Sequence, residues 1–292
     1  MLVVIVSVAL LDLAVVLCVV WGRERLVEPA LPAPASDAAR SASAPTAPRL
    51  RRHLDGLRLY AWWVSMFLVA ATASTLLVTG AGGRLAMRLV ALTSPEATGR
   101  LTEAAATVGE ITFEGTLGLL VFGALPFAFA STALYLLVAP WLPRGRLAGP
   151  TFGLAVFVIV SPFIDPLRSD NVDFDIVGPG WLSVLVFAAL AVVQGAFLAA
   201  FAGRLSRSLP LMTRTNWAET VLPLLIGVVL WPLGVILAVG ALVTFSLPRL
   251  LPWFLGVRGS RGGVIVGRVL LVLGVIAALP AFAASVVSIW GR

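Results

Sequence analysis

Long apolar stretches without charge alternate with short charged segments along the whole chain. Six stretches contain no charged side chain: residues 59–83, 115–143, 147–164, 176–203, 220–248 and 269–291. A seventh, residues 1–22, is interrupted only by Asp12. A transmembrane helix needs about 20 mostly apolar residues to cross a hydrocarbon layer of about 30 Å. The pattern therefore predicts an all-α, polytopic integral membrane protein with about seven transmembrane helices.

Composition indicates the same class. Hydrophobic residues make up 60% of the chain and charged residues 12%, and the mean hydropathy is +1.02. A soluble domain carries about 25% charged residues. The basic residues are all arginine, which together with the Ala, Val, Leu, Gly and Pro bias suggests a bacterial origin. The net charge of +7 lies mainly between the apolar stretches, so it predicts membrane orientation, and we expect no nucleic-acid partner.

The distribution of arginines predicts how the chain is threaded. Residues 23–57 are rich in Ala, Pro, Ser and Arg and have no apolar period, so we expect a disordered cytoplasmic linker there. It joins a first transmembrane helix, residues 1–22, to a helical membrane domain, residues 58–292. With Arg58, the linker region carries seven arginines, and cytoplasmic segments carry an excess of basic residues. We therefore expect a multi-pass plasma-membrane protein with an extracytoplasmic N-terminus.

Residues 220–248 are compatible with two arrangements. A single tilted span gives seven helices but places Arg249, Arg258 and Arg261 outside, against the positive-inside trend. A re-entrant hairpin folded back at Pro232 keeps these arginines inside and gives six spans plus a hairpin. Its irregular turn would have to be shielded from lipid by protein. We expect seven full spans first, because that arrangement needs no shielding.

A stripe of small residues recurs every four positions in the stretch 176–203. Its members are Ala191, Gly195, Ala199 and Gly203. Membrane helices associate through such small residues, because the two backbones can approach closely. We expect the stripe to pack within this chain, with the seam of a homo-oligomer as the alternative. The neighbouring Gln194 is expected to form a hydrogen bond between helices.

Asp12 is an ionisable residue near the middle of the first apolar stretch. A charged side chain at that depth costs at least about 2.5 kcal/mol and usually faces a partner or a water-filled cavity. One interpretation is a carboxylate that couples transport to protons or cations. The other is a neutral aspartic acid hydrogen-bonded to a neighbouring helix, or a helix shifted so that Asp12 lies at a shallower depth.

Arg84 and Arg88 follow the stretch 59–83 one helical turn apart, so on a helix they share a face. Glu110 and Glu114 have the same spacing just before the next stretch. We expect ion pairs between these arginines and acids of the outer loop. The alternatives are binding of lipid phosphate or another anion, and solvated charges that simply end a span.

Residues with catalytic or metal-binding potential are sparse. Cys18 and His53 are the only residues of their kinds, and no hydrolase, metalloprotease or nucleotide-binding motif occurs, so we expect no cofactor. Asp170, Asp173 and Asp175 alternate in one loop and weakly resemble an oxygen-rich calcium site. Their spacing does not match the EF-hand pattern, so the expected metal content is none.

Three functions are compatible with this sequence. The first is a non-enzymatic plasma-membrane component that acts through helix packing and through contacts with the lipid bilayer, with a membrane-protein partner or with a second copy. The second is a small ion-coupled transporter that uses Asp12. The third is a membrane enzyme that acts on lipid-linked substrates at the outer face. The small-residue stripe and the missing catalytic motifs favour the first.

Overall fold

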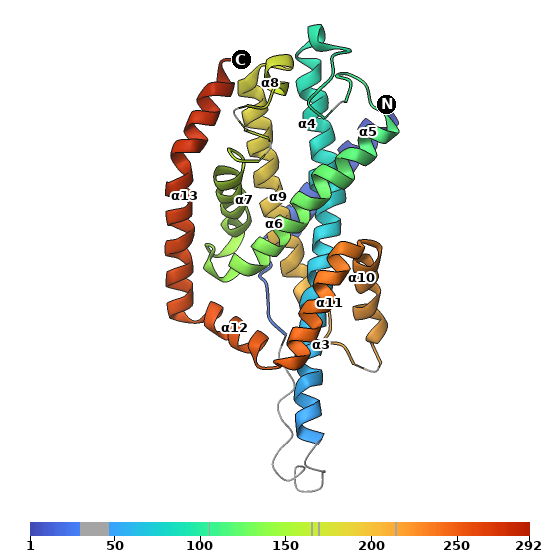
Figure 1. Cartoon of the computed structure of the whole chain (residues 1–292), viewed down its shortest axis with the longest axis vertical. Helices are drawn as coiled ribbons and strands as arrows, with labels where there is room; N and C mark the ends of the chain where they lie inside the picture. Colours follow the sequence, from blue (N-terminus) through green and yellow to red (C-terminus); the bar gives the residue numbers. More distant parts are fainter. Residues whose placement is uncertain (30–46, 105, 165, 169, 214) are drawn as a thin grey trace.

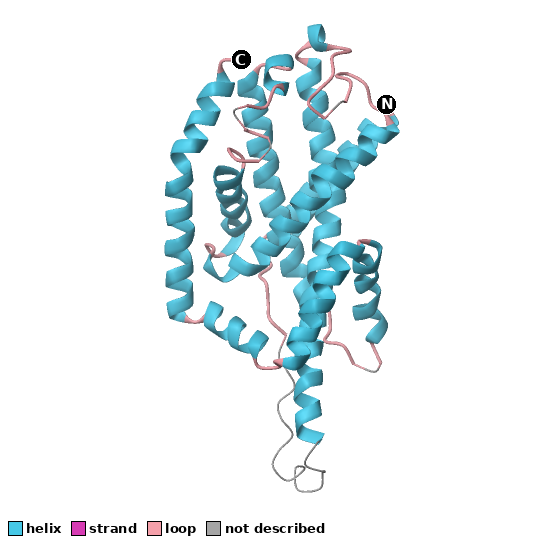
Figure 2. Ribbon diagram, viewed as in Figure 1, coloured by secondary structure: helices cyan, strands magenta, loops and turns pink. Residues whose placement is uncertain are grey.

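The computed structural model describes residues 1–29, 47–104, 106–164, 166–168, 170–213 and 215–292, and the described part is helical (Figure 1, Figure 2). Within it, the one β-type pairing is an isolated bridge between Leu101 and Thr107. The α-helices are α1 (Leu2–Trp21), α3 (Ala47–Ser74), α4 (Ala81–Leu92), α5 (Phe113–Gly118), α6 (Leu125–Val138), α7 (Ala148–Val160), α8 (Asp173–Ile176), α9 (Gly180–Ser208), α10 (Trp217–Val229), α11 (Trp231–Ser246), α12 (Leu250–Gly259) and α13 (Arg261–Trp290). The all-α prediction is confirmed for these residues.

The central element is a continuous helical rod made of α3, the π-helical segment η1 (Thr75–Gly80) and α4. Three of its large side chains, Trp62, Met66 and Leu68, are completely buried. From Leu50 to Leu92 the rod has 43 residues, which corresponds to about 65 Å at about 1.5 Å per residue. The rod therefore exceeds the thickness of a hydrocarbon layer of about 30 Å.

Other helices surround this rod. α9 packs against both α3 and α7, α6 crosses α3, and α1 lies against α9 and α4 (Figure 1). α13 is on the outside of the bundle and packs mainly on α7. The buried core includes a cluster formed by Trp62, Tyr135, Phe152 and Leu198. These side chains come from α3, α6, α7 and α9, so the four helices share one core.

Residues 217–246 form a helical hairpin rather than one span. α10 ends at Val229, and α11 begins after Leu230 with Pro232 in its first turn. The two helices approach through glycines, since a Cβ atom on Gly234 would lie 2.3 Å from the carbonyl oxygen of Gly227. Both helices pack on α3. The expected single tilted helix therefore does not form. The turn itself is open, because the side chains of Val229 and Trp231 are 81% and 72% exposed.

A bend of 97° separates α11 from α12. α12 then crosses the lower end of the molecule, and α13 returns to the upper end (Figure 1). The first and last residues of the chain lie at this upper end. This path places the loop that contains Arg249 at the same end as the start of α3.

Five described helical segments are long and apolar enough to cross a membrane, or six if α11 and α12 form one bent span. The five are α1, the α3–α4 rod, Phe113–Trp141, α9 and α13. About seven were expected. The difference arises because the stretch around α7 forms a shorter helix, Gly145–Val160, and because the hairpin divides the stretch 220–248. The architecture is consistent with a helical membrane protein.

The expected linker is shorter than predicted at both ends. Residues 47–57 belong to α3, because a proline in the first turn and leucines at helical spacing favour a helix there. At the other end, Glu24 forms an ion pair with Arg207 at 2.9 Å, and the Val27 amide donates to the Ser206 hydroxyl at 3.1 Å. Residues 30–46 of the expected linker lie outside the described part.

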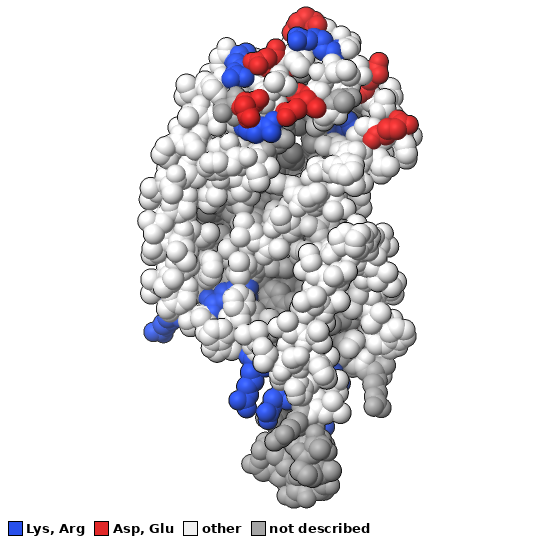
Figure 3. Space-filling view, in the orientation of Figure 1, with Lys and Arg blue, Asp and Glu red and all other residues white. Residues whose placement is uncertain are grey.

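On the face drawn in Figure 3, a belt without visible charged side chains separates two charged ends. At the upper end, acidic and basic side chains are intermingled. At the lower end, the charged side chains visible in this view are arginines. The asymmetry is the one that the positive-inside rule describes for membrane proteins.

Candidate functional site

A buried polar cluster lies where α3, α6 and α9 meet, and Gln194 is its centre. Its Nε2 donates to the hydroxyl of Ser74 at 2.6 Å and to that of Ser131 at 3.1 Å. Ser74 Oγ in turn donates to Gln194 Oε1 at 2.8 Å. All three side chains are buried. Gln194 therefore forms a hydrogen-bonded contact between helices, as expected, whereas no sequence pattern indicates that Ser74 and Ser131 are its partners.

The backbone beside this cluster is π-helical in two places. η1 follows Ser74 directly, and it contacts a second π-helical segment, η3 (Leu119–Ala124). Thr79 Oγ1 donates to the carbonyl oxygens of Ser74 at 3.2 Å and Ala124 at 3.3 Å. π-Helical turns are rare and frequently occur at functional sites. Here Thr79 links η1 to η3, directly beside the cluster formed by Ser74, Ser131 and Gln194.

The small-residue stripe lies against other parts of the same chain. A Cβ atom on Gly195 would lie 2.2 Å from the carbonyl oxygen of Gly149, and one on Gly153 would lie 2.0 Å from that of Ala191. α7 and α9 therefore touch backbone to backbone. Ala199 packs against the hydrophobic core. Further along α9, Gly203 lies against the backbone of Glu24, in the segment that follows α1.

Asp12 lies on the exposed side of α1. Ser7 and Ala14 are the buried residues of this helix, and Ala14 packs with Val78 and Phe197. Because Asp12 precedes Ala14 by only two residues, it lies at nearly the same depth in the bundle as these apolar residues. Its side chain, however, faces away from the bundle. Among the residues that the structure describes, it has no hydrogen-bond or ion-pair partner.

The expected ion pairs of Arg84 and Arg88 are not formed within the described residues. α5 begins only at Phe113, capped by the Thr112 hydroxyl, so Glu110 precedes the helix, and it does not share a helical face with Glu114. Both glutamates are exposed.

The two arginines differ in their surroundings. Arg88 Nη1 donates to the carbonyl oxygen of Gly109 at 3.0 Å. The Nε and Nη2 atoms of Arg84 are buried and have no hydrogen-bond partner in the described part of the chain. Of the two residues, Arg84 is the one with buried donors left for an anion, so the alternative of lipid-phosphate or anion binding depends on Arg84.

The acidic loop is held by ion pairs with neighbouring segments. Arg168 bridges Glu103 and Asp170, Asp175 pairs with Arg292 at 3.0 Å, and Asp173 accepts the amide of Glu103 at 2.7 Å. The three aspartates thus face different partners. No group of three His, Cys, Asp or Glu side chains among the described residues could hold a metal ion, so the geometry gives the calcium alternative no support.

Arg258 is a buried residue that the sequence did not single out as a site. Its Nη2 donates to Glu28 Oε1 at 2.8 Å, and its Nη1 donates to the carbonyl oxygen of Leu136 at 2.5 Å. Its guanidinium carbon lies 5.3 Å from the centroid of the Trp63 ring. One side chain thus joins α12 to α3, to the end of α6 and to the segment after α1. No local pattern predicts a contact between positions 230 residues apart.

The described residues thus form an all-helical bundle with five or six long apolar helices, which is consistent with a helical membrane protein. A scan against protein-family models found no match, and searches of the curated proteins and of the solved structures found none either. The inference of function therefore rests on the geometry.

Proposed function

We propose that this chain is a non-enzymatic, multi-pass plasma-membrane component that acts through lipid and protein contacts. In the proposed topology, the five long segments α1, the α3–α4 rod, α5–α6, α9 and α13 cross the membrane, and the α10–α11 hairpin re-enters from the arginine-rich end. The shorter α7, packed against α9, provides a sixth crossing. That end faces the cytoplasm, in keeping with the positive-inside rule. Two observations support this topology: the charge separation in Figure 3, and the two chain ends at the upper end in Figure 1.

The exposed position of Asp12 carries the proposal of a protein contact. A carboxyl group that faces lipid within the apolar belt costs at least about 2.5 kcal/mol. A hydrogen-bond donor or a cation from a neighbouring helix would offset this cost. The outer face of α1 is therefore the contact for a membrane helix of another protein that presents such a group.

The same position argues against ion coupling. Ionisable residues that form ion pathways face the interior of the bundle or a water-filled cavity, whereas Asp12 points away from α4 and α9. The interior cluster around Gln194, Ser74 and Ser131 contains neutral groups only. A contact role therefore agrees better with the placement of the carboxylate than a transport role.

Native mass spectrometry of the gently extracted protein tests the contact role. The wild type should retain a membrane-protein partner, and Asp12→Leu should lose it. Val16→Leu, at another exposed position of α1, should retain it. A partner-free wild-type preparation would contradict the proposal. Flux in proteoliposomes that is abolished by Asp12→Asn in a folded protein would support the transporter instead.

Cysteine-accessibility labelling tests the topology separately. Single cysteines at positions 40 and 172, in a Cys18→Ala background, report on the two sides of the membrane. The cysteine at position 172 should react with an impermeant reagent in intact cells, and the one at position 40 should react only after permeabilisation. The reverse pattern would overturn the orientation without affecting the contact proposal.

A further inference from the structure

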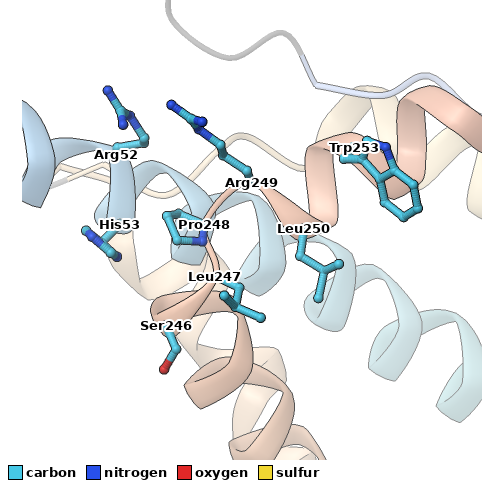
Figure 4. Close-up of a pocket in the computed structure, with 8 residues that line it drawn as sticks. All are labelled: Arg52, His53, Ser246, Leu247, Pro248, Arg249, Leu250 and Trp253. Carbon is cyan, nitrogen blue, oxygen red and sulfur yellow. The ribbon is translucent and has the colours of Figure 1, made fainter.

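A basic cavity of about 530 Å³ opens at the lower end of the molecule, between the start of α3 and the connection from α11 to α12 (Figure 4). Eight residues line it: Arg52, His53, Ser246, Leu247, Pro248, Arg249, Leu250 and Trp253. Both arginines are exposed, and their side chains extend side by side in the same direction (Figure 4).

Neither Arg52 nor Arg249 has an ion-pair partner among the described residues. The neighbouring Arg58 differs, because it pairs with Asp55 at 3.0 Å. Arg258 is likewise paired, with Glu28. Two unpaired guanidinium groups that extend together create a positive site, and guanidinium groups bind phosphate through charge-assisted, often bidentate hydrogen bonds.

Other groups around the cavity are compatible with a phosphate at a membrane surface. His53 Nδ1 donates to the carbonyl oxygen of Phe245, which orients the imidazole ring at the wall of the cavity. α12 begins at Leu250, and the N-terminus of a helix favours an anion. Trp253 is 63% exposed, and tryptophan is enriched at the level of lipid headgroups.

An apolar groove of about 620 Å³ lies above the cavity, between α3, α10 and α11. Leu57, Tyr60 and Val64 of α3 line it. These residues follow His53 at intervals of four, three and four positions, so all four share one face of α3. The opposite wall includes Ala238 and other residues of α11. The basic cavity and the apolar groove therefore succeed each other along the same two helices.

We propose that this combined site binds one anionic phospholipid of the cytoplasmic leaflet. The lipid phosphate lies between Arg52 and Arg249, and an acyl chain follows the groove between α3 and the α10–α11 hairpin. A basic pocket between membrane helices on the cytoplasmic side is typical of lipid-headgroup binding. This inference rests on the proposed membrane orientation, but not on the partner at α1.

The test is lipid binding by the purified full-length protein, measured by native mass spectrometry in detergent. The probes are phosphatidylglycerol, phosphatidylcholine and soluble glycerol phosphate. The wild type should bind phosphatidylglycerol in preference to phosphatidylcholine. The variant Arg52→Gln/Arg249→Gln should bind it about tenfold more weakly or worse, because it lacks two charge-assisted hydrogen bonds.

Two further variants separate a built site from general attraction. Arg144→Gln/Arg261→Gln removes the same charge from two exposed arginines that do not line the cavity, and this variant should bind phosphatidylglycerol like the wild type. Ala238→Phe fills the groove at an exposed position and should weaken binding of the long-chain lipid.

Three outcomes would overturn the proposal: equal losses in both arginine pairs, equal binding of the two lipids, or glycerol phosphate binding as strongly as the lipid. The last would indicate a site for a soluble anion. If accessibility labelling reversed the topology while these results held, the orientation would be wrong and the lipid site would lie in the outer leaflet.

Discussion

At the lower end of the molecule, one arginine and a pair of arginines have opposite environments. Arg258 is closed in by protein: 4% of its side chain is exposed, and it contacts Glu28, Leu136 and Trp63. Arg52 and Arg249 are open and have no ion-pair partner in the part of the chain that the structure describes. A closed arginine stabilises the fold, whereas an open pair is available to a ligand. Exposure and pairing, rather than residue type, separate these two roles.

Removal of the closed arginine should have the largest effect on stability. Arg258→Ala leaves the Leu136 carbonyl oxygen and the Glu28 carboxylate without this partner. Breaking a buried pair costs about 3–5 kcal/mol, and because Glu28 is 46% exposed we expect a loss near the lower value. Titration with a denaturing detergent measures it. Arg261→Ala removes an exposed arginine three positions away and should change the free energy of unfolding by at most about 0.5 kcal/mol.

A small effect of Arg258→Ala, equal to that of Arg261→Ala, would contradict the distinction between closed and open arginines. Arg258→Lys refines the result. Lysine keeps the charge but has no planar fork to reach a carbonyl oxygen and a carboxylate together. We expect it to recover only part of the loss.

The buried polar cluster around Gln194 should have an intermediate effect on stability. Gln194→Leu removes hydrogen bonds to Ser74 and Ser131 but adds no charge. Interhelical hydrogen bonds in membrane proteins contribute about 0.6 kcal/mol on average and about 1.7 kcal/mol at most. We therefore expect a loss in that range. A double-mutant cycle with Ser131→Ala isolates the pair, and additive losses would show that the two side chains do not interact energetically.

Much of the fold could be predicted because membrane helices are encoded locally. Each apolar stretch requires only its own residues to be recognised, and the stripe from Ala191 to Gly203 follows from helical spacing alone. The expected pairing of Arg84 and Arg88 with Glu110 and Glu114, which is not formed among the described residues, shows where local spacing is insufficient. It depended on where α5 begins, and the cap at Thr112 leaves Glu110 outside the helix.

The closed and open arginines could not be told apart from the sequence. Arg249 and Arg258 lie nine positions apart in one segment, and their different environments depend on the 97° bend before α12 and on Glu28. Pro232 interrupts the apolar stretch and so indicates a hairpin as the alternative to a single span. The sequence alone does not decide between the two, because the contacts of both helices with α3 join segments that are distant in sequence.

Removal of the open arginines should have the smallest effect on the isolated protein and a clear effect in the presence of lipid. Without lipid, Arg52→Gln/Arg249→Gln should change the free energy of unfolding by at most about 0.5 kcal/mol, because both side chains are exposed and unpaired. Added phosphatidylglycerol should stabilise the wild type, by about 1.4 kcal/mol at ten times its Kd, since a ligand that binds only the folded state favours that state. The variant should gain much less from the same concentration. Equal gains would place the lipid elsewhere on the protein, and a large loss without lipid would mean that these arginines are closed like Arg258.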